Sequence, residues 1–238
     1  MNAEIAKLRF LPTPRLLAAG ILAICIATGA GLFIAAPTHA SSYVNASSVA
    51  LEFAGSLPII VLGVWIVAVE FASGTLQRTL TAQSNRSKVL VAKLSLVVLV
   101  ALVLCVAAAA TSGGLADLAS SRAGVTVDRG DLARAMFGTV PTGVATVVVG
   151  FAFALLTRSM GGGIALAAAF VFVLDGLLGF VPGVGHLTFD SLTQDLSNHI
   201  SDVGQTHHSA GVAILGIVVW LLVLLIPGWL LFVRGDLK

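Results

Sequence analysis

The sequence predicts an all-α, polytopic membrane protein with six transmembrane helices and both termini in the cytoplasm. Hydrophobic residues make up 58% of the 238 residues, charged residues only 10%, and the mean hydropathy is +1.03. A soluble domain carries about a quarter charged residues and has too little interior to hide so much apolar surface. Six spans of about 20 residues each fill most of such a chain. We therefore expect a single transmembrane domain over residues 1–238, with no room for a soluble catalytic domain.

The apolar runs divide the chain into six segments of membrane-spanning length. The predicted spans are 16–36, 50–71, 89–110, 136–157, 162–181 and 211–233. Of the 13 Lys and Arg residues, ten fall at the termini or in and beside the connections after the second and fourth spans. Basic residues are retained on the cytoplasmic side of membrane proteins. Both termini and these two connections are therefore predicted to be cytoplasmic, and the multi-pass protein is expected in a bacterial plasma membrane.

The three remaining connections are predicted to lie outside the cell. The first, 37–49, is short and uncharged, and the second, 111–135, mixes three Asp with three Arg. The third, 182–210, is predicted to be a structured outer loop that contains a helix. One face of that helix would carry Leu192, Leu196, Ile200 and Val203, which recur at helical spacing. Asp195 and Asp202 would point away from that face, and the helix would lie on the membrane surface or across the outer mouth.

Histidine and cysteine give no metal motif. Four of the five histidines fall in the third outer connection: His186, His199, His207 and His208. Their spacing matches no tight zinc-ligand pattern, so a solvated polar loop is predicted rather than a metal site. Cys25 and Cys105 both lie in apolar runs, and we expect them to be buried as small hydrophobic residues.

Four charged residues lie within or near the predicted spans, where an unpartnered charge is costly. Glu70 and Lys93 lie near cytoplasmic span ends and Glu52 near an outer end, so placement of the charges at the membrane interface would explain them. Asp175 lies deeper, in the outer half of the fifth span. It either makes a structural hydrogen bond to a neighbouring helix or lines a translocation path.

Motifs for catalysis are missing from the sequence. It contains no GxxxxGK[ST] phosphate loop, no HExxH, no GxSxG and no CxxC. The net charge of +2 is too small to indicate a nucleic-acid partner. We therefore do not expect this chain to be an enzyme.

The most distinctive stretch is the cytoplasmic connector over residues 71–88. Ser73, Gly74 and Thr75 are predicted to break the second span, and Leu76 and Leu80 lie one helical turn apart. A short helix held against the cytoplasmic face can dock into another protein. A solvated connector that carries positive-inside charges is the alternative interpretation.

This stretch, VEFASGTLQRTLTAQSNRSKVLVAKL at 69–94, resembles the segment between the second and third helices of ABC-2-type transporter permeases. That family typically has a Glu, a Gly-Thr pair, a short leucine-bearing helix, a Ser-Arg-rich turn and a Lys. Two further stretches look similar to the family: ALLTRSMGGGIALAAAF at 154–170 and LFVRGDLK at 231–238. The segment before the first span departs from the pattern, because it is short and carries Pro12 and Pro14.

The resemblance implies the ABC-2 fold, which is the type V exporter fold, and the membrane half of an ATP-driven exporter. Two six-helix subunits, either two copies or this chain with a sister permease, would form the pathway. Two separate ABC ATPase subunits would bind ATP and Mg²⁺ and receive the connector as a coupling helix, and the outer loop would cap the pathway. The residues expected to couple to the ATPase are Glu70, Gly74, Thr75, Leu76 and Arg78.

A stand-alone secondary transporter or an integral membrane assembly factor is the competing class. A secondary transporter is expected to show broken spans at matching positions of two repeats. Pro58 and Pro227 fall in the second and sixth spans, which are not equivalent in a three-plus-three division. A membrane-embedded enzyme is disfavoured because the spans lack clustered His and Asp. Walls rich in Ala, Val, Leu, Gly and Phe would suit an amphipathic or lipid-like cargo.

Overall fold

The structure, a computed structural model, describes residues 12–73, 86–202 and 204–234. These residues form an elongated helical assembly, and none of them lies in a β-strand. The helices are α2 (Pro12–Ala35), α3 (Ala40–Val49), α4 (Ser56–Ser73), α6 (Arg86–Arg122), α7 (Arg129–Gly138), α8 (Val140–Thr157), α9 (Met160–Ala169), α10 (Asp175–Gly179), α11 (Phe189–Ser201) and α12 (Ala210–Arg234). Two π-helical segments, η1 (Ala50–Ala54) and η2 (Phe170–Leu174), and a 3₁₀ turn, η3 (Gly185–Leu187), complete the described elements.

Six of the described helical runs are long and apolar enough to cross a membrane, which confirms the predicted number. They are Thr13–Ala35, Ala40–Phe71, Ser87–Arg122, Arg129–Thr157, Met160–Gly179 and Ala210–Val233. The second run joins α3, η1 and α4, and the fifth joins α9, η2 and α10. Each of these two runs therefore contains a π-helical segment within an otherwise α-helical span.

The first two predicted outer loops are wrong in their secondary structure, because most of 37–49 and 111–135 is helical. Tyr43 of α3 is fully buried, and its hydroxyl donates a hydrogen bond to the Pro37 carbonyl. At the start of α7, the Asp128 side chain accepts hydrogen bonds from the Gly130 and Asp131 N–H groups. Tertiary packing and capping thus lengthen the second, third and fourth helical runs beyond their most apolar stretches.

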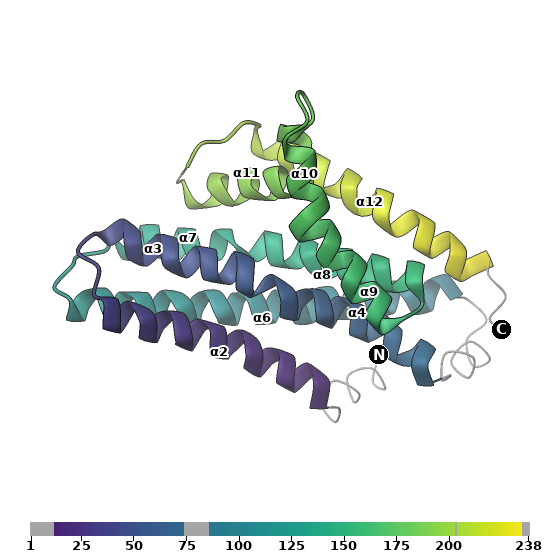
Figure 1. The fold of residues 1–238 in the computed structure, drawn as a ribbon, viewed down its shortest axis with the longest axis horizontal. Coiled ribbons are helices and arrows are strands. Elements are labelled where there is room, and N and C mark those ends of the chain that lie inside the picture. The colour runs from purple at the N-terminus through teal and green to yellow at the C-terminus, as the bar shows by residue number, and fades with distance from the viewer. Residues whose placement is uncertain (1–11, 74–85, 203, 235–238) are drawn as a thin grey trace.

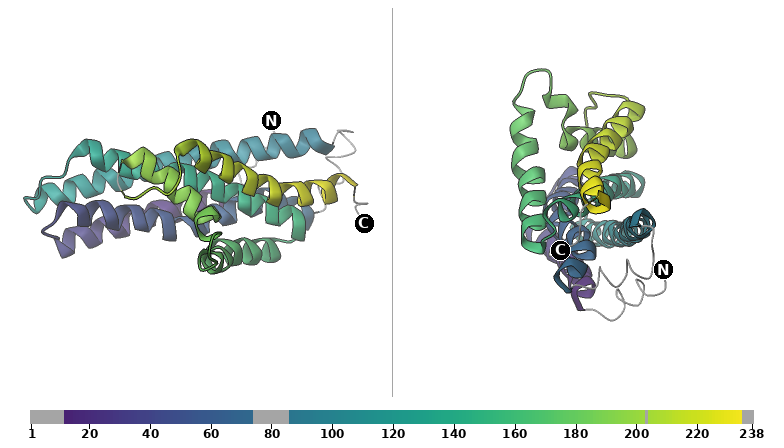
Figure 2. Two further views of the ribbon diagram at one scale, coloured as in Figure 1. Left: turned by 90° about the horizontal axis from the view of Figure 1, so that it is seen from above. Right: turned by 90° about the vertical axis from the view of Figure 1, so that its right-hand side faces the viewer.

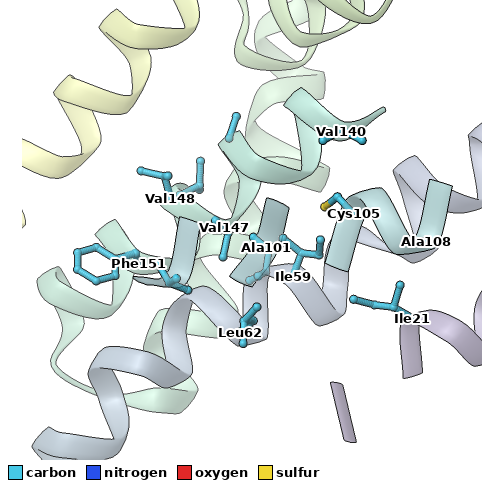
Figure 3. Close-up of a cluster of buried hydrophobic side chains, with 14 of the residues drawn as sticks. Ile21, Ile59, Leu62, Ala101, Cys105, Ala108, Val140, Val147, Val148 and Phe151 are labelled. Carbon is cyan, nitrogen blue, oxygen red and sulfur yellow. The ribbon is translucent and has the colours of Figure 1, made fainter. Parts of the chain in front are cut away.

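The core lies between α4, α6 and α8, with α8 at its centre. Buried side chains from the three helices meet there, among them Ile59, Leu62, Ala101, Cys105, Val147 and Phe151 (Figure 3). Glycines allow the backbones of α4 and α8 to approach closely, because a Cβ added at Gly150 would lie 2.6 Å from the Ile60 carbonyl oxygen. Cys25 and Cys105 are free and buried, which confirms the interpretation as small hydrophobic residues.

The peripheral helices expose most of their apolar surface. Only 22% of the most apolar window of α2 and 11% of that of α12 is buried, against 69% for the run that contains α4. An apolar helix that is exposed on most sides is suited to lipid rather than to water. The end-on view shows α9–α10 and α12 as separate limbs on the central bundle (Figure 2).

The ends of the helices define two ends of the molecule. α4 ends at Ser73 and α6 begins at Arg86 at the same end at which α8 passes to α9 and α12 finishes (Figure 1). We call this the connector end, because the connector 74–85 joins α4 and α6 there in the sequence. The turns 36–39 and 123–128 and the helix α11 lie toward the other side, which we call the outer end.

Candidate functional site

A buried ion pair lies at the connector end. The Lys93 Nζ of α6 donates a hydrogen bond to the Glu70 Oε1 of α4 across 2.7 Å, and the two side chains are only 4% and 2% exposed. The two charges are therefore paired with each other inside the helix packing, and their predicted position at the membrane interface stays a prediction. A buried ion pair is costly to break, because removing one partner leaves an uncompensated charge in a medium of low polarity.

The ion pair joins the two helices that flank the connector. Glu70 lies three residues before the end of α4 at Ser73, and Lys93 lies seven residues after the start of α6 at Arg86. Of the five predicted coupling residues, only Glu70 is among those the structure describes. Gly74, Thr75, Leu76 and Arg78 lie outside the described residues. The ion pair therefore joins α4 and α6 close to both ends of the connector.

Two further contacts extend this group to α8, α9 and α12. Phe71, next to Glu70, packs edge-on against Phe232 of α12, with ring centroids 6.2 Å apart. The Arg158 guanidinium, at the turn between α8 and α9, donates a hydrogen bond to the Leu231 carbonyl of α12 across 2.9 Å. Neither contact was predicted from the sequence. At the connector end, several helices are therefore held together by side-chain contacts.

The glycines of the α8–α9 junction permit a close helix contact. Arg158 ends α8 in the left-handed conformation (φ 52°), and Ser159 begins α9 by accepting a hydrogen bond from the Gly162 N–H. A Cβ added at Gly163 would lie 2.9 Å from Val64 of α4 and 3.2 Å from the Ala154 Cα. α9 can therefore rest on both α4 and α8 only because this position carries no side chain.

At the outer end, Asp175 binds the first turn of α11. Asp175 is 2% exposed, and its two carboxylate oxygens accept hydrogen bonds from the Phe189 N–H (2.9 Å) and the Asp190 N–H (2.7 Å). A carboxylate is favoured at a helix N-terminus, where backbone N–H groups lack partners. The hydrogen bond to a neighbouring helix was one of the two interpretations of Asp175. The same side chain also lines a cavity, so its second interpretation, as part of a pathway, stays a prediction.

A second buried carboxylate secures the chain that follows α11. Asp195 is 2% exposed and accepts hydrogen bonds from the His207 N–H (2.9 Å) and the His208 N–H (3.2 Å), and the His208 Nδ1 lies 2.9 Å away. Burial by itself raises the pKa of Asp195, but the His207 N–H and the His208 side chain together lower it below its usual value. The prediction that Asp195 points away from the packed face of the helix is wrong, because its carboxylate is buried and binds His207 and His208.

The histidines make specific contacts, although His186, His199 and His207 stay exposed, as a solvated polar loop predicts. The rings of His186 and His207 are stacked with centroids 4.3 Å apart, and the His199 Nε2 lies 2.7 Å from the His208 carbonyl oxygen. Among the described residues, no group of three or more His, Cys, Asp or Glu side chains is placed to hold a metal ion.

The helix predicted in the third outer loop exists as α11. Its Leu192 is buried, whereas Ile200 is 38% exposed and Val203 lies outside the described residues.

A scan against protein-family models matches none of them to this chain, and no curated protein sequence is significantly similar to it. The class of protein that the fold defines is therefore a multi-pass helical membrane protein with six candidate spans.

Proposed function

We propose that this chain is the transmembrane permease subunit of an ATP-binding cassette exporter of the ABC-2 type. It would pair with a second six-helix subunit, a copy of itself or a sister permease, and with two separate ATPase subunits that bind ATP and Mg²⁺. The observation that carries the proposal is the buried Glu70–Lys93 pair, because it ties together the two helices that enter and leave the connector. The family-like sequence of the connector supplies the rest of the argument.

The contacts of the connector end suit the transmission of force. A push on the connector would reach α4 and α6 together, because Glu70 and Lys93 hold them at 2.7 Å. Phe71 would pass the displacement to α12 through Phe232, and the glycine-mediated contact of α4 with α8 would pass it to the core. Packed helices of this kind move as rigid bodies between discrete arrangements. ATP-driven closure of the partner ATPases would thus switch the pathway between inward-facing and outward-facing states.

The proposed topology puts the connector end in the cytoplasm of a bacterial cell. Ten of the 13 Lys and Arg residues belong to the termini and the two connections assigned to that side. The large exposed apolar faces of α2, α9–α10 and α12 would contact lipid and the second subunit. In this arrangement Arg78 meets an acidic group on the ATPase, while Gly74 and Thr75 allow the break before the coupling helix that contains Leu76.

The test is co-purification of this chain with the ATPase encoded next to it. We expect Arg78→Gln to lower the amount of co-purified ATPase, or the ATPase stimulation, by roughly tenfold or more, as truncation of an interface hot spot does. Gly74→Val should have a similar effect. The matched control is Arg134→Gln, which removes the same charge from an exposed position on α7. If the ATPase does not associate with the wild-type chain in detergent, the exporter proposal is contradicted.

One observation favours the secondary transporter as a second candidate. The second and fifth spans carry η1 and η2, and these two spans are equivalent when the six are divided into two sets of three. Both spans nevertheless stay helical throughout, unlike the unwound helices of typical carriers. Purified chain in proteoliposomes, without any ATPase, separates the candidates: cargo uptake driven by a proton or sodium gradient would support the carrier and contradict the exporter.

A further inference from the structure

The outer half of the molecule contains a cavity of about 370 Å³ between η1, α8, η2–α10 and α11. Its polar lining includes Glu52 and Asp190 as charged members besides the capping residue Asp175. Its apolar lining includes Val49, Val171 and Phe172. Such a mixture of a hydrophobic wall and a few polar groups is typical of sites for small organic molecules.

Both π-helical segments of the described chain face this cavity. Glu52 belongs to η1, whereas Val171 and Phe172 belong to η2. π-Helical segments are rare and occur frequently at functional sites, because the extra residue re-aims side chains within a helix. These two segments, about 120 positions apart in the chain, both line the same cavity. The backbone geometry therefore indicates a functional site here, in agreement with the lining residues.

The charge of the cavity has one sign. A second depression of about 490 Å³ adjoins it on the outer side, shares Asp175, Asp190 and Gln194 with it, and adds Asp195. None of the described residues that line either space is Lys or Arg. A cleft with acidic lining and walls of low polarity concentrates cations.

Among the described residues, Glu52 and Asp190 lack the kind of cationic partner that Glu70, Asp117 and Asp195 have. Glu70 is paired with Lys93, Asp195 with His208, and Asp117 with Arg129. Glu52 accepts only a 3.3 Å hydrogen bond from the neutral Gln194 side chain, and neither it nor Asp190 forms an ion pair with any described Lys, Arg or His. A carboxylate within a membrane span is expected to have a cationic partner or a functional role.

We propose that this cavity binds a monovalent organic cation with an apolar body, whose charge lies near Glu52 and Asp190 and whose body lies against Val171 and Phe172. A bare metal ion is disfavoured, because the described carboxylates are too dispersed to form a group of three ligands and the space is much larger than an ion. The inference names the cargo class of the proposed permease and rests on that proposal only for calling the ligand a cargo.

The experiment is equilibrium dialysis of radiolabelled tetraphenylphosphonium against the purified full chain in detergent, with no ATPase present. We expect saturable binding to the wild type, and an affinity lowered by about tenfold or more in Glu52→Gln, which keeps the hydrogen bond to Gln194 but loses the charge. Asp190→Asn should lower the affinity by a smaller factor, because Asp190 is exposed to solvent. Asp131→Asn is the matched control, since it removes one exposed negative charge on α7 and should leave the affinity unchanged.

Tetraphenylborate, which has the same shape and the opposite charge, should show no saturable binding. The inference is overturned if tetraphenylphosphonium binds the wild type, Glu52→Gln and Asp190→Asn equally, or if tetraphenylborate binds as tightly. It is also overturned if millimolar Mg²⁺ displaces the probe at constant ionic strength, which would identify an inorganic cation site. If Glu52→Gln fails to fold, the Asp190→Asn variant still decides the matter. The binding experiment contains no ATPase, so its outcome does not depend on whether the ATPase co-purifies. The cation site and the exporter function can therefore be contradicted independently.

Discussion

The two ends of the molecule differ in whether a buried or half-buried carboxylate, Glu70 at one end and Glu52 at the other, is paired with a described cation. At the connector end, Glu70 and Lys93 neutralise each other out of contact with solvent. At the outer end, Glu52 and Asp190 border an open cavity and have no described cationic partner. A charge that is satisfied internally fixes the relative position of two helices, whereas a charge left facing a cavity is available to a ligand. This difference agrees with the two proposals, in which the connector end transmits force and the outer end binds the ligand.

The largest expected effect follows from breaking the ion pair. Lys93→Met should lower the free energy of unfolding by about 3–5 kcal/mol, because it removes the ammonium group that lies 2.7 Å from the buried Glu70 carboxylate. Unfolding by sodium dodecyl sulfate titration of the detergent-solubilised chain measures this loss. The control is Lys88→Met, which removes the same side chain from an exposed position on α6.

The double variant Glu70→Gln/Lys93→Met completes a thermodynamic cycle. If the pair stabilises the helix contact as described, the double variant should be more stable than Lys93→Met alone, because both charges of the pair have been removed. Additive losses from the two single changes would mean that the side chains act independently, and the comparison between the two ends would fail.

The sequence was sufficient for the number of spans but not for their lengths or contacts. A run of about 20 apolar residues is a local property, so the six spans could be counted directly. The helical extension through α3 was missed because residues 37–49 form no long apolar run, whereas the helix is held by the burial of its own Tyr43 in the fold.

Long-range pairing explains the remaining errors. Glu70 and Lys93 are 23 positions apart, and Asp195 and His208 are 13 apart, so neither pair follows from helical periodicity. One signal was available for the first pair: an acid and a base lie near the same end of two consecutive spans. The π-helical segments left no such signal, because they arise from packing between helices rather than from residue type.

An intermediate effect is expected where α4 and α8 touch. Gly150→Ala should lower the free energy of unfolding by about 1–3 kcal/mol, because the new Cβ would lie 2.6 Å from the Ile60 carbonyl oxygen. This contact links the connector end to the core, so ATPase stimulation should fall as well if the proposed function holds. The control is Gly20→Ala in α2, where no atom lies within 4 Å and the substitution should be neutral or stabilising. Equal effects of the two substitutions would show that α4 and α8 are not in backbone contact.

The smallest expected effect concerns Asp195 and the pH dependence of the outer end. Burial raises the pKa of this carboxyl group. The hydrogen bonds from the His207 N–H and the His208 side chain outweigh burial, so the pKa is lowered in the folded protein. A carboxyl group whose folded pKa is depressed adds stability above its unfolded pKa of about 3.9, and loses that contribution as the pH falls through the folded pKa. The wild type should therefore be more stable than Asp195→Asn by about 1 kcal/mol or more near neutral pH.

That difference should shrink steadily below about pH 4, where the carboxylate becomes protonated. Hydrogen exchange of the backbone amides of His207 and His208 is the direct measurement, because both donate to the carboxylate of Asp195. Asp131→Asn is the control, since Asp131 is exposed and pairs only with its helical neighbour Arg134. A stability difference between wild type and Asp195→Asn that grows on acidification would reverse the predicted sign. The carboxylate of Asp195 would then not hold the segment that follows α11.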